Sequence, residues 1–441
     1  NRSLSGFLAK VGAEEAMQSD KVVWTEQGRL HISITGVTLD ESTSIIGFAS
    51  AAEAGLIRKH DTLLMYCTAG TKIGTTVKVL VTDLDQDSLA SGSDTLGIKV
   101  APYDYASMAN GNSGYDDTSV FTVMVYGSEY KKGSTADRHA LTPGFLTFDN
   151  KPIIMRDMYQ INGSDTAQIG WVEVSGEEGQ NGFMWYLKAE GDTRSRFNDY
   201  LEMSMIEARK AVAGSAALAA IHGDIAGTEG LLQAIENRGH VSTDTFTDTG
   251  SSSAQATADL DYFDDILVKL DGQGAIEENM LYLDRHDSLD FDNMLAGVSI
   301  GSAGGTAYGL FDNSSDMALN LGFIGFRRGS YDFYKSDWKY LNNVSAHGAH
   351  AAAAGNSKLS GVLCPAGTSS VYDETMGRNV KRPFVHVRYR ASQTDNRRLK
   401  TWVTGSVGGN ITSDLDAMTV NYLTERCLVV QAANNFMKFV R

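Results

Sequence analysis

Cysteine, proline and long apolar runs are all scarce in this chain of 441 residues, and each shortage excludes a class of protein. No run of about 18 apolar residues occurs, so the sequence predicts no membrane-spanning helix. The three cysteines, Cys67, Cys364 and Cys427, lie far apart, and there is no CxxC pair. An odd, scattered set fits assembly in a reducing cytosol better than a disulfide-bonded scaffold.

Basic residues are also few. The chain has 38 Lys and Arg against 54 Asp and Glu, which gives a formal net charge of −16. Proteins that hold nucleic acid neutralise its phosphates with clustered Lys and Arg, so this balance disfavours a nucleic-acid-binding surface. The balance is compatible with a surface that lies near nucleic acid without binding it, and solubility alone is the simpler explanation.

Glycine is abundant where proline is not, with 45 Gly and 5 Pro. This composition favours strands that are joined by long loops with many tight turns. The length of the chain predicts two or three domains. No internal repeat with a period of about 20 to 50 residues is visible.

The first third of the chain has the pattern of β-strands. From Lys21 to about Asp104 short alternating runs follow one another, and the alternation on both sides of Gly28 predicts a hairpin. We expect these strands to form a small sheet or barrel of their own. A further strand is predicted at VFTVMVYGS, after a loop rich in Asn, Gly, Ser and Asp.

The segment 145–189 has strand propensity but poor alternation, which predicts an extended hairpin that buries little by itself; its last part, GFMWYLKA, reads as a strand. A long helix is predicted over 190–222, with Asp192 or Thr193 as its N-cap and Gly214 as a point where it ends or kinks. The apolar positions expected on its buried face are Phe197, Leu201, Met205, Ala208 and Val212.

The second half of the chain predicts an α+β body. A polar loop at 241–256 precedes a helix that stops at Gly272. A short helix is expected at 288–297, a strand pair around Gly329, and a nearly continuous buried strand at the C-terminus. The apolar stripe of the helix before Gly272 is Leu260, Phe263, Leu267 and Leu270.

A search for catalytic motifs finds little. The phosphate loop GxxxxGK[ST] and the zinc motif HExxH are both absent. Residues 297–301 match the nucleophile-elbow pattern GxSxG, but the elbow follows a strand, and a helix is expected here. A serine hydrolase is therefore disfavoured.

Two polar clusters have simple structural explanations. His347 and His350 are spaced for one helical face, but no carboxylate or cysteine lies near them in the sequence to complete a metal site. The run from Asp284 to Asp287 offers an acid and a base together. A strand-to-helix turn with Asp287 or Ser288 as the cap explains it as well.

Three further patterns are weaker. The segment from Asp83 to Asp94 has the spacing of a calcium loop, but lacks its central Gly and its final Glu, which disfavours a calcium site. The aromatic and basic run from Phe326 to Lys335 has residues that stack nucleic-acid bases, although a core strand pair explains it better. Acid pairs that resemble glycosidase carboxylates, without a fixed separation, are Glu177-Glu178, Asp264-Asp265 and Glu277-Glu278.

A family resemblance is carried by five stretches in the last two thirds of the chain. They are KPIIMRDMYQINGSDTAQIGWVEV (151–174), WYLKAEGDTRSRFNDYLEMSMIEARKA (185–211), GSYDFYKSDWKYLN (329–342), VHVRYRASQ with NRRLKTWVTGSVGG (385–409), and YLTERCLVVQAANNF (422–436). In this order they resemble the major capsid proteins of tailed phages with the Hong Kong 97-like fold. Within that family the chain is most similar to the capsid proteins of crAss-like phages.

The resemblance implies an α+β capsid fold with a spine helix at 190–222 and an order of parts along the chain. The parts are an N-terminal arm (1–20), an added β-rich domain (21–144), an extended hairpin loop (145–189), a peripheral domain with the spine helix (190–275), an axial domain (276–405) and a return to the peripheral domain (406–441). Proteolytic removal of a preceding scaffold segment, as in many members of the family, would account for a chain that begins at Asn1.

The resemblance also implies a structural protein that is not an enzyme and uses no cofactor or metal. Copies would assemble in the host bacterial cytoplasm into hexamers and pentamers of an icosahedral head, with portal or decoration proteins, and enclose double-stranded DNA without binding it specifically. Charged residues expected at contacts between copies are Glu177, Glu178, Arg194, Glu202 and Arg209. Two alternatives stay open: a β-rich virion decoration or carbohydrate-binding protein, which 21–144 would explain, and a glycosidase, which the paired acids would explain.

Overall fold

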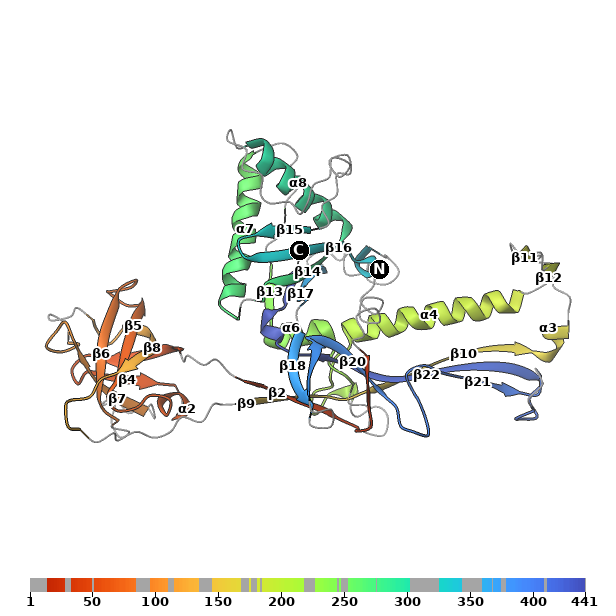
Figure 1. Ribbon diagram of the computed structural model, residues 1–441, viewed down its shortest axis with the longest axis horizontal. Helices are drawn as coiled ribbons and strands as arrows, with labels where there is room; N and C mark the ends of the chain where they lie inside the picture. The colour runs from red at the N-terminus through yellow and green to blue at the C-terminus, as the bar shows by residue number, and fades with distance from the viewer. Residues whose placement is uncertain are drawn as a thin grey trace. The chain divides into compact units, whose positions relative to one another are not determined.

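The computed structural model describes residues 14–27, 33–49, 51–84, 96–109, 115–134, 145–167, 174–175, 181–182, 185–217, 227–243, 246, 253–274, 276–301, 325–342, 359–366, 368–373, 378–407 and 411–440. The chain divides into two compact units (Figure 1). One is Thr25–Thr147, which we call the barrel unit, and it overlaps the predicted β-rich segment 21–144. The other combines Asn1–Trp24 with Phe148–Arg441, and we call it the main unit.

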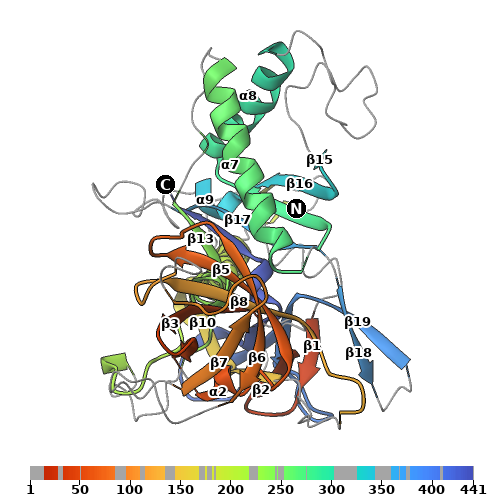
Figure 2. The same cartoon turned by 90° about the vertical axis from the view of Figure 1, so that its left-hand side faces the viewer.

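The barrel unit is built around a closed barrel of six strands, drawn in orange and brown in Figure 2. The strand order is β3-β4-β7-β6-β5-β8, and all neighbours are antiparallel. The strands are β3 (Ser33–Asp40), β4 (Ile45–Phe48), β5 (Asp61–Ala69), β6 (Thr76–Asp83), β7 (Leu96–Pro102) and β8 (Val120–Ser128), with one short helix, α2 (Ala51–Ala54).

Alternation in the sequence explains the barrel. In β6 the side chains of Val77, Val79 and Val81 are buried, while Lys78 between them is exposed. The neighbouring strand β5 buries Leu63 in the same way. The inward side chains of all six strands meet in one apolar cluster, so the segment that was predicted to form a small sheet or barrel forms a barrel.

The hairpin predicted around Gly28 is wrong. Strand β2 (Val22–Gln27) pairs with β9 (Phe145–Asn150) in a two-stranded sheet, and β3 pairs with β4 and β8. Both runs were correctly read as strands. The alternation of a strand fixes which face is buried, but it does not say which other strand lies beside it, and here the partner of β2 is distant in sequence.

The main unit contains two larger sheets. The five-stranded sheet has the order β1-β20-β22-β10, with β21 also paired to β22, and the six-stranded sheet has the order β13-β23-β17-β14-β16-β15. The strands of the first sheet are β1 (Glu14–Met17), β10 (Ile153–Asn162), β20 (Val385–Arg390), β21 (Lys400–Gly405) and β22 (Ala417–Val430). Those of the second are β13 (His240–Ser242), β14 (Glu278–Leu283), β15 (Gly325–Arg328), β16 (Tyr331–Asp337), β17 (Leu359–Pro365) and β23 (Met437–Val440).

Helices cover these sheets. They are α4 (Trp185–Glu207), α6 (Leu231–Arg238), α7 (Ser253–Asp271), α8 (Arg285–Gly301) and the short α3 (Gly163–Ala167) and α9 (Lys339–Asn342). Helices α7 and α8 pack on one face of β14, against Leu281 and Leu283. The other face of β14, with Tyr282, joins a core cluster that also holds α6, the end of α4 and β20 and β22 of the five-stranded sheet. Two small ribbons, β11 (Val174–Ser175) with β12 (Asn181–Gly182) and β18 (Thr368–Asp373) with β19 (Arg378–Pro383), complete the described strands.

The long helix differs from the prediction at both ends. It begins at Trp185, so the last part of GFMWYLKA is helical. The Thr193 hydroxyl donates to the carbonyl of Ala189 at 2.9 Å, a bond inside a helix, so neither Asp192 nor Thr193 is the N-cap. The helix ends at Glu207, well before 222, and Val212 is 73% exposed instead of buried. Positions 218–222 lie outside the described residues.

A close backbone approach explains the early end of α4. A Cβ at Gly230 would lie 2.8 Å from backbone atoms of Ala208 and Ile206, and one at Gly227 would lie 2.4 Å from the carbonyl of Arg209. The N–H of Gly230 donates to the Ala208 carbonyl at 2.9 Å, so the segment that leads into α6 takes the hydrogen bond that a longer helix would have used. The signal lies in glycines some twenty residues away, which helical periodicity does not contain.

Other predictions for the second half fare better. Helix α7 stops where expected, with the N–H of Gly272 bonded to the Val268 carbonyl, although it begins at Ser253, inside the predicted loop. Helix α8 is longer than the short helix that was predicted at 288–297. The strand pair around Gly329 is confirmed, with Gly329 at φ +62°. The C-terminal strand is not continuous, because Ala432 at φ +52° and a short 3-10 turn, η2 (Ala433–Asn435), separate β22 from β23.

Two expectations from the composition, on the cysteines and on membrane-spanning helices, can be compared with this mixed α+β, strand-rich fold. All three cysteines are free and buried. Burial raises the pKa of the Cys364 and Cys427 thiols to about 12, so both stay protonated near neutral pH. Among the described helices none is long and apolar enough to cross a membrane.

Candidate assembly surface

Helix α4 packs along β10 and β22 of the five-stranded sheet, and Figure 1 shows helix and strands running side by side. Phe197 and Leu201 on the helix are buried against Val420 and Tyr422 of β22, and Met155 of β10 packs beside them. The rings of Phe197 and Tyr422 have centroids 5.9 Å apart. These two helix positions were predicted for the buried stripe, so the sheet is the surface that the stripe covers.

The last turns of α4 are held by hydrogen bonds as well as by packing. Glu202 accepts a hydrogen bond from the indole nitrogen of Trp338 at 3.4 Å, and Glu207 accepts one from the Tyr340 hydroxyl at 2.9 Å. Burial, followed by the nearby charge of Glu207, raises the pKa of Tyr340. Met205 is buried in the same core cluster, so this end of the helix is fixed to the segment that follows β16.

Strand β10 has two different faces. Asp157 forms an ion pair with Arg196 of α4 at 3.2 Å, and the alternating side chains on its side of the strand face the helix. Ile154 and Met158 have the opposite parity and point away from the helix. They are 57% and 60% exposed, although both are large and apolar.

The face turned away from α4 continues over the neighbouring strands. In the strand register Met158 lies opposite Asn421 of β22, and Asn421 lies opposite Trp402 of β21. Residues directly opposite one another in an antiparallel pair share a face, so Trp402 is on the same side as Met158 and Ile154. We call the surface made by Ile154, Met158 and Trp402 the outer ribbon face. Helix α4 covers the other side of the sheet.

The opposite edge of this sheet is held by ion pairs. Strand β1 runs parallel to β20, and its two acidic residues reach nearby arginines. Glu15 pairs with Arg388 of β20 at 2.8 Å, and Glu14 pairs at 2.5 Å with Arg398, which lies between β20 and β21. Glu14 also lies 3.9 Å from the guanidinium of Arg426. Burial lowers the pKa of Arg426, because it disfavours the charged guanidinium, and the negative charge of Glu14 opposes this effect.

A second acid extends the cluster. Glu425 of β22 pairs with Arg390 at 2.7 Å and with Arg397 at 3.1 Å, and Arg390 also pairs with Asp20 just after β1. The hydrogen bond from Arg390 to Asp20 raises the pKa of that guanidinium. The sequence search did not find this cluster. Its signal is the alternation of arginine in VHVRYR, which places Arg388 and Arg390 on one side of a strand.

The structure places three of the five predicted contact residues. Arg194 is exposed on α4, Glu202 is half-buried beside Trp338, and Arg209 is exposed and pairs with Glu236 at 2.7 Å. Glu202 and Arg209 therefore already have partners within the chain. Glu177 and Glu178 lie outside the described residues.

The structure also places several of the residues that were considered as candidates for catalysis or metal binding. Residues 297–301 lie within α8, so the strand-turn-helix of a nucleophile elbow does not form there. The turn before α8 is confirmed, but its cap is Asp284, whose carboxylate accepts the Asp287 N–H at 2.7 Å, and not Asp287 or Ser288. His347 and His350 lie outside the described residues, as does Asp94 with most of the calcium-loop pattern.

One group of possible metal ligands is present in the part of the chain that the structure describes. Ligand atoms of His286, Asp287 and Asp290 lie within 4.8 Å of one another, and His286 Nδ1 is 2.9 Å from Asp290 Oδ2. The sequence search had singled out the first two residues but not Asp290, which lies one helical turn on. A hydrogen-bonded start of a helix accounts for the same group.

The aromatic and basic run 326–335 forms a core strand pair. The rings of Phe326 and Phe333 are stacked with centroids 5.1 Å apart, and both are buried under α7 and α8. Arg328 pairs with Asp264 of α7, and Lys335 pairs with Asp292 of α8. The rings of Phe326 and Phe333 therefore belong to the core, which confirms the interpretation as a core strand pair.

Comparison with known proteins gives distant likenesses. No family model matches the chain, and no curated protein does. Among solved structures the chain is similar to one from Mycobacterium phage Ogopogo, with 12% identity, a TM-score of 0.35, and coverage of 71% of this chain and 82% of the other. For the capsid structure of the cyanophage P-SCSP1u the values are 9%, 0.36, 71% and 79%. A capsid of a native GTA particle gives 11%, 0.35, 71% and 80%.

Proposed function

We propose that this chain is the major capsid protein of a tailed phage, with the Hong Kong 97-like fold and of the kind found in crAss-like phages. Copies assemble into hexamers and pentamers of an icosahedral head, which encloses double-stranded DNA without binding it specifically. The protein acts in the virion and assembles in the host cytoplasm, together with portal and decoration proteins. It works by contacts alone and is not an enzyme.

The observation that carries this proposal is the outer ribbon face. A sheet buried by α4 on one side leaves Ile154 and Met158 more than half exposed on the other. Exposed apolar side chains that gather on one rigid face mark a surface for contact with another protein. The order of the resembling stretches, which includes β10, β21 and β22, supports identifying that other protein as a second copy.

The structure also suggests how the contacts are kept in place. A shell is held by many modest interfaces whose sum is large, and each interface must be presented at a constant angle. Helix α4 supports the five-stranded sheet through Phe197 and Leu201, and the bonds of Glu202 and Glu207 fix the end of the helix to the segment after β16. The net charge of −16 suits an enclosing shell, because it disfavours adhesion to the phosphates inside.

The finer assignments follow the same proposal. The arm at 1–20 would include β1, which the acid and arginine cluster fixes to the sheet edge. In this proposal the extended loop is the part of 145–189 that precedes α4, the spine helix is α4, which begins at Trp185, and the axial domain is 276–405. Arg194 is an exposed charged residue on α4 that would reach a neighbouring copy, while Glu202 and Arg209 would act through their own partners first.

The test is whether the purified full-length chain forms closed shells. We expect electron microscopy to show particles or capsomers, and sedimentation to show one large species. Met158→Asp should leave the circular dichroism spectrum unchanged and abolish assembly, because a charge on the outer ribbon face must be desolvated at the contact. Ile73→Asp is the matched control, since Ile73 is an exposed isoleucine of the barrel unit.

Two outcomes distinguish a failure of the capsid proposal from a failure of the proposed contact surface. A wild-type chain that stays a monodisperse monomer under all assembly conditions would overturn the capsid proposal. Normal particles from Met158→Asp would leave that function standing and show that the outer ribbon face is not the contact.

A further inference from the structure

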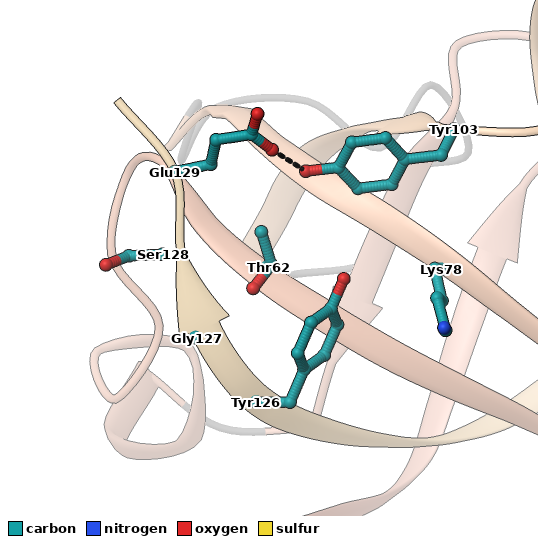
Figure 3. A pocket seen from close by; sticks show the side chains of 7 residues that line it. All are labelled: Thr62, Lys78, Tyr103, Tyr126, Gly127, Ser128 and Glu129. Carbon is teal, nitrogen blue, oxygen red and sulfur yellow. Dashed lines mark hydrogen bonds between the residues drawn. The ribbon is translucent and has the colours of Figure 1, made fainter. Parts of the chain in front are cut away.

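The barrel unit has a pocket on its outer surface that the assembly proposal does not use. It is an open depression with a volume of about 530 Å³. Figure 3 shows Tyr103 and Tyr126 on either side of it, with Thr62 between them and Lys78 and Glu129 at its margins. These residues come from the ends of four neighbouring strands.

A bulge and a close approach shape this pocket. Strand β8 has a bulge against β5, where Thr62 pairs with Gly127 and Leu63 pairs with Val125, which leaves Tyr126 as the extra residue. A bulge bends the strand and re-aims the side chain that it carries. At Gly127 a Cβ would lie 3.2 Å from the Thr62 hydroxyl, so any larger residue would crowd the floor of the pocket.

The rim of the pocket is fixed before any ligand arrives. The Tyr103 hydroxyl donates to Glu129 Oε2 at 2.6 Å, and this bond raises the pKa of Tyr103 to about 12. The N–H of Tyr103 is bonded to the carbonyl of Lys78, and that of Glu129 to the carbonyl of His60. The bridge therefore joins the end of β7 to the end of β8, across β6 and β5. A rim held in this way loses little entropy when a ligand binds.

What distinguishes the two tyrosine rings is their place beside the pocket. Tyr103 is 47% exposed and Tyr126 is 49% exposed, much as Tyr66 is elsewhere on the barrel. Rings left open beside a pocket offer flat apolar faces to a ligand. Around them stand a hydroxyl on Thr62, an ammonium on Lys78 and a carboxylate on Glu129, which supply both donors and acceptors.

We propose that this pocket binds a short neutral saccharide. A sugar ring has an apolar C–H face that can lie on a tyrosine ring, and its edge carries hydroxyls that donate and accept hydrogen bonds at once. Glu129 accepts from one or two of these hydroxyls, and Lys78 and Thr62 bond the next ones. The proposal does not depend on how the chain assembles.

Other classes of ligand fit the pocket less well. A nucleotide or another polyanion would meet Glu129, in a unit with fourteen Asp and Glu against nine Lys and Arg between 25 and 147, a net charge of −5. An extended peptide commonly adds to a free sheet edge, and the six strands of this barrel close on themselves. A purely apolar ligand would leave the charged margins without partners.

The experiment is a titration of the full-length chain with maltose, cellobiose, lactose and chitobiose, followed by calorimetry and by saturation-transfer NMR. We expect at least one disaccharide to bind. Tyr126→Ala should weaken that binding by about tenfold, because it removes the stacking face. Tyr103→Phe keeps the ring but releases Glu129 from its bridge, and should weaken binding by roughly threefold or more.

Tyr66→Ala is the matched control. Tyr66 is a similarly exposed tyrosine on β5 that does not line the pocket, so the variant should bind and melt as the wild type does. The absence of binding by all four disaccharides would overturn the proposal. So would binding that Tyr126→Ala and Tyr103→Phe leave unchanged, or binding of a short oligothymidylate in place of every sugar.

Discussion

The barrel and the five-stranded sheet deal with the edges of a sheet in opposite ways. The barrel closes on itself, so each of its six strands is paired on both sides and its apolar side chains point to one interior. The five-stranded sheet stays open. It ends in β1, which ion pairs attach, and it leaves the apolar Ile154 and Met158 exposed on the face of β10 that α4 does not cover.

Both proposals made above depend on this difference. A closed barrel is complete as a single copy, so its outer surface is free to carry a pocket for a small ligand. An open sheet with an exposed apolar face is incomplete alone, because unpaired edges and bare faces favour association with another chain. The most informative substitutions are those that affect one unit and leave the other intact.

The largest effect is expected from Leu201→Asp. Leu201 is buried between α4 and β22, so the variant loses apolar packing and places a carboxylate in the core. We expect a loss of about 4 kcal/mol or more in the stability of the main unit. Thermal denaturation followed by circular dichroism measures the loss, and limited proteolysis with mass spectrometry should still recover a protected fragment near 25–147.

The neighbouring Tyr200→Asp is the control for that experiment, because Tyr200 is on the exposed side of the same helix. Its melting temperature should stay close to that of the wild type. Equal melting of the two variants would contradict the packing of α4 described here. Simultaneous loss of the barrel fragment would show that the two units do not fold separately.

A smaller effect is expected at the edge that ion pairs hold. Glu425→Gln removes a nearly buried carboxylate that pairs with Arg390 and Arg397, and leaves both guanidinium groups without it. We expect the free energy of unfolding to fall by about 1–3 kcal/mol. Hydrogen exchange should rise first in Glu14–Met17, because Arg390 also bonds Asp20 beside that strand.

Asp395→Asn provides the comparison for this variant. Asp395 pairs with Lys400 at 2.8 Å, but both side chains are more than two-fifths exposed, so the change should cost less than about 1 kcal/mol. If the two variants were equally stable, the cluster around β1 would be an ordinary surface network and not an anchor.

The sequence predicts the elements of this protein better than their partners. Alternation located the barrel strands, and the four-residue and three-residue spacing found the buried face of α4 at Phe197, Leu201 and Met205. The hairpin at Gly28 and the extension of α4 to 222 failed for one reason. Each depends on a distant contact, with β9 in the first case and with Gly227 and Gly230 in the second.

The candidate sites were harder still to predict. The pocket needs a bulge at Tyr126 and a bridge from Tyr103 to Glu129, residues that are 26 apart in sequence. The outer ribbon face could be predicted only if it were known which side of the sheet α4 covers. Residue types alone gave Glu202 as a contact between copies, and the structure gives it a first partner in Trp338, 136 residues away.

The smallest expected effect is a pH-dependent change in the stability of the main unit that the barrel unit should not show. In the main unit the hydrogen bond from Lys210, 2.7 Å away, lowers the pKa of Asp149 below its usual value near 4, and Lys21 lies 3.6 Å from the same carboxylate. A depressed folded-state pKa contributes stability above the unfolded-state pKa, and the contribution is lost as the pH falls through the folded-state value. Asp149→Asn should therefore cost about 0.2–1 kcal/mol at pH 7 and almost nothing near pH 2, since these side chains are about one-third exposed.

Unfolding midpoints of wild type and Asp149→Asn, measured from pH 7 down to pH 2, give this difference directly. Lys210→Met should reproduce most of it, and adding it to Asp149→Asn should change little further, because both remove the same pair. Asp83→Asn, in the exposed pair with Lys59 of the barrel unit, should have almost no effect at either pH. A difference that persists unchanged at pH 2 would mean that Asp149 contributes by packing and not by its charge.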